Sequence, residues 1–353
     1  MQTILIPSRH PEFAAMVAYG IRKFDKNVKI IYVAIHVEFP AARFSSSIDK
    51  FYYCSSKENQ LKFLIDIIKE NQVDLFYPVD EDEILFTIQN FKEINKVTSV
   101  VRLASEESFI IASNKWKLSS FLVTQDCNVA KGARQNDQNQ LQYPILAKDV
   151  NGSFGKGITL LRDESEYMEY DSENKDVFFE EFIEGYDLVC NVYCQDGEIL
   201  AHTILKPKYF GDKGFTSKYD QHVFAPNPRV LKLVAQCIKA LNWNGIGSLD
   251  IRYDVDKDRY VIIEMNPRYW ATLISSVEMG VNFPYIMMLD KVEKNMHSDI
   301  KDEKVFYSLR YLLKNESFLK KLSALKKSDL NYRLHNLKST FHSVQRILKK
   351  RYS

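Results

Sequence analysis

Apolar runs alternate with amphipathic stretches along residues 1–104. The runs have the composition of buried strands, and the stretches repeat apolar residues every three or four positions, as helices do. The expected strands are Thr3–Ile6, Lys29–Ile35, Leu75–Val79 and Val97–Leu103, and the expected helices are Pro11–Phe24, Glu58–Glu70 and Glu83–Ile94. This alternation predicts a parallel sheet with helices on both faces. Its ligands are expected at the carboxyl ends of the strands, where Pro7–His10 and Pro78–Glu83 lie.

The pattern changes after residue 104. Ser105 and Asn114 each precede a helical pattern and are suited to cap it. Short strands separated by tight turns then predict antiparallel pairing. They are Tyr143–Val150, Gly157–Leu161, Val177–Ile183, Leu188–Gln195 and Ile199–Leu205. A helix over Asn227–Leu241 and a hairpin of Gly247–Tyr253 with Tyr260–Met265 complete this part.

The C-terminal segment is basic. Residues 314–353 contain eleven Lys and Arg residues against two acidic ones. Its apolar residues share one helical face: Leu330, Leu334, Leu337, Phe341, Val344, Ile347 and Leu348. Two interpretations stay open, a helix docked on the core and a basic amphipathic helix that contacts anionic lipid or an acidic partner.

Composition narrows the class of protein. A chain of 353 residues is long enough for two or three domains, and 45% apolar with 27% charged residues is typical of a folded protein. The net charge of +2 gives no reason to expect a nucleic-acid partner. Five cysteines without a CxxC pair favour reduced thiols and a cytoplasmic location. The start MQTILIPSRH is expected to be a strand and not a signal peptide, and no apolar stretch is long enough for a transmembrane segment.

The first candidate for chemistry is a glycine-rich loop that follows a strand ending in Lys148. The loop contains Gly152, Ser153, Phe154, Gly155, Lys156 and Gly157. Glycines let backbone N–H groups approach phosphate oxygens closely, and the Ser and Lys side chains add donors. Such loops are also common as plain turns between strands, so by itself this one leaves both interpretations open.

The second candidate is the segment VFFEEFIEGYD. Its strand runs into Glu180, Glu181, Phe182 and Ile183, which offer backbone groups and an apolar side chain to an adenine ring. Asp187 follows the turn at a position suited to ribose hydroxyls. A strand end with solvated carboxylates explains the same pattern.

The third candidate is a pair of strands that carries oxygen ligands. Asp250 lies in one strand of the expected hairpin, and Glu264 and Asn266 lie two apart in the other, so these last two face the same side. Two carboxylates and an amide are the ligands that Mg²⁺ bridging phosphates prefers, and Mn²⁺ is bound by similar oxygen ligands. Arg268, just beyond, has a guanidinium suited to a carboxylate or an acyl phosphate.

The order of these segments resembles the ATP-grasp superfamily. The resemblance rests on Asn114–Lys115, Lys148, the loop GSFGKG, EEFIEG and above all EMNPR behind LDIR, and it covers about residues 1–295. It is closest to the carbamoyl-phosphate-synthase-like and biotin-carboxylase-like branch of carboxylate–amine ligases. The fold it implies is α/β and α+β: a Rossmann-like pre-ATP-grasp domain (1–104), a helical linker with a lid subdomain (105–185) and a C-terminal ATP-grasp subdomain with the metal site (186–300). A basic helical tail (301–353) follows.

The resemblance also implies roles for individual residues. Lys115 and Lys148 would contact ATP phosphates, and residues 152–157 would form the lid over them. Glu180, Glu181, Phe182 and Ile183 would line the adenine, and Asp187 would hold the ribose. Asp250, Glu264 and Asn266 would bind one or two Mg²⁺ (or Mn²⁺), and Arg268, with Lys148, would serve catalysis. Two positions depart from the usual pattern, since Asp187 and Asp250 stand where Glu is commoner.

The expected activity is that of an ADP-forming ligase. A carboxylate attacks the γ-phosphorus of ATP to give an acyl phosphate, and an amine then displaces phosphate. The alternatives are a bicarbonate-using carboxylase or carbamoyl-phosphate-synthase-like subunit, a kinase, and an ATP-binding protein without turnover. Expected partners are small-molecule carboxylate and amine substrates, with a homodimer as a further possibility; the pattern does not identify the substrates.

Overall fold

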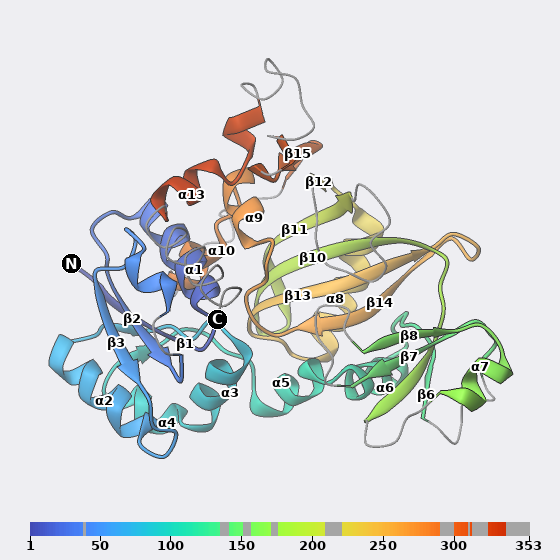
Figure 1. Ribbon diagram of the computed structural model, residues 1–353, viewed down its shortest axis with the longest axis horizontal. Helices are drawn as coiled ribbons and strands as arrows, with labels where there is room; N and C mark the ends of the chain where they lie inside the picture. The colour runs from blue at the N-terminus through green and yellow to red at the C-terminus, as the bar shows by residue number, and fades with distance from the viewer. Residues whose placement is uncertain are drawn as a thin grey trace, which may run out of the picture.

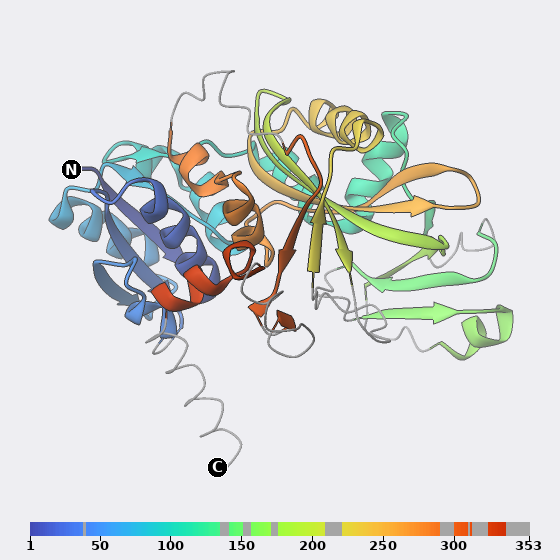
Figure 2. The same ribbon diagram turned by 90° about the horizontal axis from the view of Figure 1, so that it is seen from above.

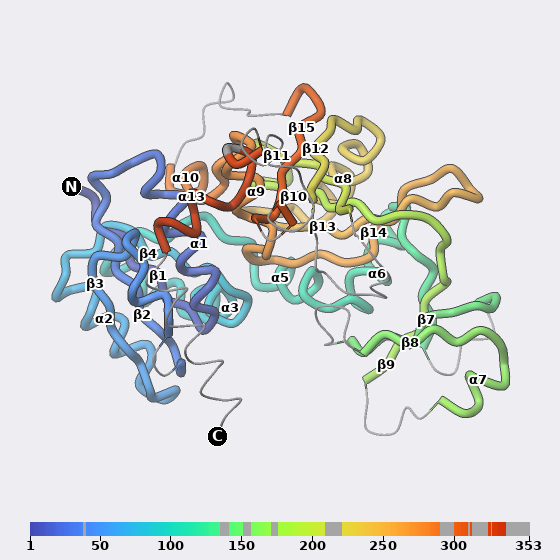
Figure 3. The backbone as a smooth tube through the Cα atoms, turned by 45° about the horizontal axis from the view of Figure 1, so that its top comes forward, coloured from blue at the N-terminus to red at the C-terminus, as the bar shows by residue number. Residues whose placement is uncertain are grey.

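The computed structural model describes residues 1–37, 40–134, 141–150, 157–170, 176–208, 221–289, 300–309, 311–312 and 324–336. Its strands form three sheets of five, six and four strands. Figures 1 and 3 show the five-stranded sheet at one end of the molecule, the four-stranded sheet at the other and the six-stranded sheet between them. The predicted mixture of α/β and α+β parts is therefore confirmed.

The N-terminal sheet is parallel, with strand order β3-β2-β1-β4-β5. Its strands are β1 (Thr3–Ser8), β2 (Lys29–Ile35), β3 (Lys50–Cys54), β4 (Leu75–Phe76) and β5 (Ser99–Val100). Every residue of β1 is buried, which is typical of a central strand with helices on both sides. The helices are α1 (Pro11–Phe24), α2 (Gln60–Asn71), α3 (Glu81–Gln89) and α4 (Phe91–Asn95).

Two parts of this domain differ from the sequence prediction. Strand β3 was not expected, because most of its residues are only half-buried and the pattern KFYYC lacks the apolar run of an inner strand. The helix expected over Glu83–Ile94 is two helices, since Asn90 ends α3 by donating its side chain to the carbonyl of Phe86 at 2.8 Å. Helix α3 begins earlier than expected because Asp80 caps it by accepting from the amide of Glu83.

The six-stranded sheet has the order β14-β13-β10-β11-β12-β15, and all its pairs are antiparallel. Its strands are β10 (Gly185–Gln195), β11 (Glu198–Lys208), β12 (Gln221–Phe224), β13 (Gly245–Asp254), β14 (Arg259–Asn266) and β15 (Lys304–Tyr307). The helices that cover it are α5 (Glu106–Ser113), α6 (Lys115–Thr124), α8 (Pro228–Ala240), α9 (Leu273–Met279) and α10 (Phe283–Met288).

The two faces of this sheet join different cores. Leu188, Cys190 and Val192 of β10 belong to a core with α5, α6 and α8. The alternate residues Val189 and Tyr193 join α9, α10 and helix α1 of the N-terminal domain in a second core. Figure 2 shows α8 on one side of the sheet. Successive side chains of a strand point to opposite faces of the sheet. Strand β10 therefore contacts α5, α6 and α8 on one face and α9, α10 and the N-terminal helix α1 on the other.

The small sheet has the order β6-β9-β7-β8 and is antiparallel. It consists of β6 (Gly132–Ala133), β7 (Ile145–Asp149), β8 (Ile158–Leu161) and β9 (Val177–Glu181), with α7 (Glu164–Glu169) beside it. Its own core is small and centres on Ile145, Ala147 and Phe179.

The segment after residue 300 differs from the helical tail that the sequence predicted. It begins with β15, which pairs with β12 and extends the six-stranded sheet. A 3-10 turn, η4 (Leu325–Lys327), and the short helix α13 (Leu330–His335) follow, and Figure 2 shows α13, in red, beside α1. Tyr332 of α13 packs on Tyr19 of α1 with ring centroids 5.4 Å apart. Helix α13 therefore contacts the core through Tyr332, whereas Leu334, one of the apolar residues expected to share the docked face, is 53% exposed. Residues 337–353 lie outside the described residues. Within the described ranges, no helix is long and apolar enough to cross a bilayer.

Candidate active site

Strands β13 and β14 bring the three predicted metal ligands together. Their register places Asp250 opposite Glu264 and Ser248 opposite Asn266, with a register shift just after Asp250. The side-chain amide of Asn266 donates to Oε1 of Glu264 at 3.3 Å. Two carboxylates and an amide therefore lie side by side on adjacent strands, as the spacing in the sequence predicted.

Lys115 joins this group from helix α6. Asn114 caps the helix by accepting from the amide of Lys117, which places Lys115 at its first position. Helix α6 packs against β14, and Nζ of Lys115 lies 3.1 Å from Oε2 of Glu264. A lysine at the start of a helix is usually solvated, and only the packing of α6 on β14 brings this one to the carboxylates.

The two carboxyl groups have opposite pKa shifts. Burial, together with Glu264 beside it, raises the pKa of Asp250 well above its usual value. Burial also disfavours the charged form of Glu264, but Lys115 outweighs it and the pKa of Glu264 is lowered. The two carboxyl groups also share a hydrogen bond, and positive charge placed beside them would favour the ionised form of both.

Lys148 and Glu180 form a second pair in the small sheet, on the neighbouring strands β7 and β9. Both side chains are almost inaccessible to solvent, with 5% and 3% exposed. Burial raises the pKa of Glu180, and Lys148 opposes that shift. Glu264 and this pair act on each other electrostatically, so the small sheet and the six-stranded sheet face each other here.

The segment expected to line an adenine is already hydrogen-bonded in part. The amide of Glu181 donates to the carbonyl of Lys131 at 2.9 Å, and the amide of Phe182 donates to the carbonyl of Pro144 at 3.3 Å. The carbonyl of Ile183 accepts from Nε of Arg252 at 2.7 Å. These three backbone groups are therefore engaged within the protein.

The carboxylates of this segment have partners that the sequence did not indicate. Glu181 forms ion pairs with Arg259 at 3.1 Å and Lys257 at 3.4 Å. Asp187, predicted to bind ribose, is paired with Arg252 at 2.7 Å and is half exposed. The side chain of Glu181 thus ties the small sheet to the β13–β14 hairpin, whereas Asp187 keeps one side open to solvent.

The glycine-rich loop lies mostly outside the described residues, since only Gly157 is described. Its φ of +77° is left-handed, and a Cβ there would lie 2.9 Å from Cβ of Asp149. Its carbonyl accepts from the amide of Asp149 at 3.0 Å. Glycine is therefore required where β8 begins. The predicted contacts of Gly152, Ser153, Phe154, Gly155 and Lys156 with phosphate stay predictions.

Arg268 contacts both the metal-ligand candidate Asn266 and the N-terminal domain. Nη2 donates to Oδ1 of Asn266 at 3.0 Å, and Nη1 donates to the carbonyl of Tyr269 at 2.9 Å. Nε lies 3.8 Å from Oε2 of Glu81, and the guanidinium carbon lies 5.4 Å from the ring centre of Phe13. Sequence reasoning did not single out Glu81 or Phe13. The available signal was the position of Pro78–Glu83 at the carboxyl end of a parallel strand, where ligands of such sheets collect.

These residues fit a divalent cation and a polyphosphate. Within the described ranges, no group of three or more His, Cys, Asp and Glu side chains lies together as a metal site. A cation would therefore use Asp250 and Glu264 with the amide oxygen of Asn266 as the third protein donor, all of them hard oxygens. Two adjacent carboxyl groups repel each other when both are ionised, and a bound divalent cation would offset that repulsion.

The fold and these residues define the class of protein. Residues 112–272 match the family model of the ATP-grasp domain. The chain therefore contains an ATP-grasp domain, and the resemblance seen in its motifs is confirmed.

Individual proteins that resemble this chain share 25% or less of its sequence. A carbamoyl-phosphate synthase of Methanobrevibacter smithii is 25% identical over 178 residues, so the aligned part spans about half of each protein, 48% of both. The N5-carboxyaminoimidazole synthetase of Staphylococcus aureus, solved with ADP, has a TM-score of 0.67 at 14% identity over 87% of this chain and 82% of that one. The L-amino acid ligase of Bacillus licheniformis has a TM-score of 0.64 at 17% identity over 82% of this chain and 73% of that one. These similarities show the ATP-grasp fold.

Proposed function

We propose that the protein is an ADP-forming ligase that activates a carboxylate as an acyl phosphate for attack by an amine. The arrangement of Lys115, Glu264, Asn266 and Arg268 around one point carries this proposal. A lysine ammonium that can bind a phosphate, a carboxylate and an amide oxygen that can bind a metal ion, and a guanidinium beside them suit the transfer of a phosphoryl group to a carboxylate. Similarity to an L-amino acid ligase also favours an amine as acceptor.

Each residue has a separate task in this reaction. Asp250, Glu264 and Asn266 would hold Mg²⁺, which neutralises charge on the triphosphate. When Mg²⁺ binds, it would become the positive partner of Glu264. Lys115 would then move from Glu264 to a phosphate oxygen of ATP. Lys148, fixed by Glu180, would direct its charge toward the same phosphates. Arg268 would stabilise the phosphoryl group in transfer or hold the substrate carboxylate.

The bonds made and broken balance without a protein nucleophile. A carboxylate oxygen forms the bond to the γ-phosphorus, and the bond from that phosphorus to the bridging oxygen of ADP breaks. The amine nitrogen then forms the bond to the acyl carbon, phosphate leaves with its electron pair, and the proton of the amine passes to solvent. Closure of the small sheet over the site would keep water from the acyl phosphate.

A second candidate uses bicarbonate as the carboxylate. Similarity to a carbamoyl-phosphate synthase and to an N5-carboxyaminoimidazole synthetase favours it. Both candidate functions would use the same residues to bind ATP and the metal. They differ in the substrate that would bind beside Arg268, a carboxylic acid in the first and bicarbonate in the second. The assay described next separates the two candidates, because it compares bicarbonate with other carboxylates.

The test measures ADP and phosphate release from Mg²⁺-ATP in the presence of pooled amino acids, small carboxylic acids or bicarbonate, with hydroxylamine as a trap. ADP that depends on a carboxylate and appears with a hydroxamate supports the ligase. ADP that depends on bicarbonate alone supports the second candidate. Mg²⁺-ATP binding without ADP release in every pool contradicts both.

A further inference from the structure

We propose that Glu81 of the N-terminal domain is a positioning residue for Arg268, so that the first domain holds the guanidinium in the geometry needed for ligation. This inference rests on the proposed function, in which Arg268 contacts the reacting phosphoryl or carboxylate group. Its structural part, the contact between Glu81 and Arg268, is tested separately below.

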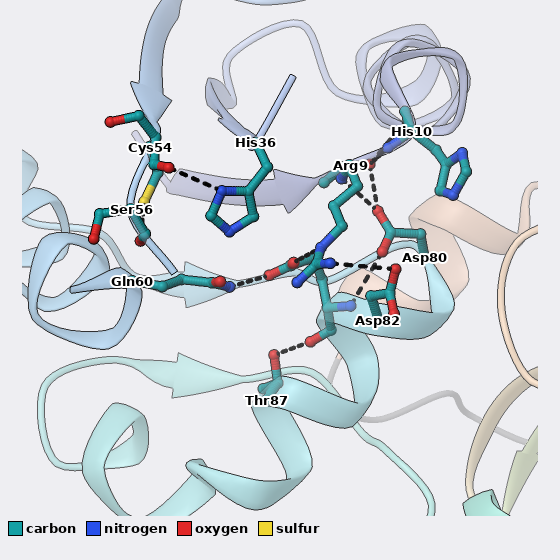
Figure 4. A network of polar contacts seen from close by, with 12 residues as sticks. Arg9, His10, His36, Cys54, Ser56, Gln60, Asp80, Asp82 and Thr87 are labelled. Carbon is teal, nitrogen blue, oxygen red and sulfur yellow. Dashed lines mark hydrogen bonds and ion pairs between the residues drawn. The ribbon is translucent and has the colours of Figure 1, made fainter. Parts of the chain in front are cut away.

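Glu81 belongs to four consecutive acidic residues, 80–83, at the start of α3. Figure 4 shows that Asp80 is turned back into its own domain. Its Oδ2 accepts from Oγ of Ser8 at 2.6 Å and from the amide of Arg9 at 2.8 Å, and its Oδ1 accepts from the amide of Glu83 at 3.1 Å. Asp80 thus anchors the first turn of α3 to the end of β1.

Glu83 fixes the same turn from the other side. It is fully buried, and its Oε1 and Oε2 accept from Nε of Arg9 at 3.0 Å and from Nε2 of Gln60 at 2.7 Å. Asp82 has a longer contact with Arg9 at 3.7 Å and is 59% exposed (Figure 4). Three of the four acids therefore face strand β1 and helix α2, and they leave Glu81 as the member directed to another domain.

The guanidinium of Arg268 is held from both domains. Neighbouring residues in the chain supply Oδ1 of Asn266, at the end of β14, and the carbonyl of Tyr269, both to the terminal nitrogens. The N-terminal domain supplies the carboxylate of Glu81 beside Nε and the ring of Phe13 under the plane. Arg268 is 15% exposed, so most directions in which it could turn are closed.

The contact between Glu81 and Arg268 gains importance because Asn266, which also contacts Arg268, is a proposed metal ligand. In the proposed function the oxygen that accepts from Nη2 of Arg268 is also a metal ligand. A cation held by Asn266 would repel the guanidinium and compete for that oxygen, and Arg268 would then lose one of its two contacts with neighbouring residues in the chain. Glu81 then supplies the negative charge that keeps Arg268 beside the site.

The experiment compares Glu81→Gln with Asp82→Asn in the full-length chain. Both variants remove one carboxylate charge from the first turn of α3, but only the first removes the contact with Arg268. In the carboxylate assay described above, Glu81→Gln is expected to lower kcat about tenfold with the KM for Mg²⁺-ATP unchanged. Asp82→Asn is expected to have less than about a twofold effect on either parameter. Glu81→Gln added to Arg268→Lys is expected to cause no further loss.

A second measurement does not depend on turnover. In protein labelled with ¹⁵N-arginine, the Nε–Hε signal of Arg268 is assigned by its loss in Arg268→Lys. We expect Glu81→Gln to shift this signal and to speed its exchange with water about tenfold, while Asp82→Asn leaves it in place.

Each outcome decides one point. An Arg268 signal that is the same in Glu81→Gln as in the wild type overturns the positioning role, whatever the assay shows. An equal loss of kcat in the presence and absence of Arg268 also overturns it, because Glu81 would then act on its own. If no carboxylate supports ADP release, the proposed function fails, and the NMR comparison alone decides whether Glu81 holds Arg268.

Discussion

Two lysine–glutamate pairs face each other across the site, and they differ chiefly in burial. Lys148 and Glu180 are 5% and 3% exposed, whereas Lys115 and Glu264 are 17% and 25% exposed. A pair removed from water cannot exchange partners cheaply, because each charge left alone would be desolvated. A pair that water reaches can separate when a phosphate and a cation arrive. The buried pair is thus a fixed part of the site, and the more accessible pair is the part that would respond to a ligand.

The largest expected effect on activity comes from replacing Glu264, the acidic member of the more accessible pair. Glu264→Gln removes a carboxylate that we propose as a metal ligand, and we expect ADP formation to fall at least about 100-fold, by analogy with the loss of one electrostatic stabiliser at a catalytic centre. The chain should stay folded, because the glutamine keeps the shape of the side chain. Calorimetry with Mg²⁺-ATP and the ADP assay measure this, and turnover at the wild-type rate would exclude Glu264 as a metal ligand.

Breaking the buried pair should act mainly on stability. Lys148→Met leaves the carboxyl of Glu180 buried without its partner, which costs about 3–5 kcal/mol in comparable sites. Hydrogen exchange of β7 and β9, with urea unfolding, measures the loss. The double variant Lys148→Met with Glu180→Leu should recover most of it. Equal instability of the single and double variants would contradict the account of an uncompensated charge.

The pair of Arg9 and Glu83 lies between these extremes, because only its carboxylate is fully buried. Burial, together with Asp80, raises the pKa of Glu83 to about 7. The folded state therefore holds a proton that the unfolded state releases above its ordinary pKa of 4.5. This contribution to the free energy of unfolding is complete below that value and is lost as the pH rises to about 7, a total of about 3 kcal/mol. Urea unfolding between pH 5 and 8 should show the decline, and Glu83→Gln should flatten it.

The smallest expected effect on stability is that of Lys115→Met. An accessible ion pair contributes about 0–1 kcal/mol, so the urea midpoint should barely move. The affinity for Mg²⁺-ATP should nevertheless fall about tenfold, because the proposed contact between Lys115 and a phosphate is lost. A loss of stability as large as that of Lys148→Met would remove the distinction between the two pairs.

Several local features followed from neighbouring residues alone. The bounds of α1 and β2 agree with the prediction at both ends, and Ser105 and Asn114 cap α5 and α6 as expected. The hairpin that brings Asp250 together with Glu264 and Asn266 also agrees, because a short turn between two strands leaves little choice of register. Strand β3 was missed because an edge strand needs no continuous apolar run.

The sequence by itself therefore determined many of the strands and helices, the ATP-grasp motifs and the presence of each charged residue. Only the tertiary structure decided which charges meet. It paired Lys148 with Glu180, Lys115 with Glu264 and Arg268 with Glu81, in each case across elements that are distant in the chain. The physical reason is that periodicity depends on neighbours along the chain, whereas the partner and the burial of a charge depend on how separate sheets and helices pack.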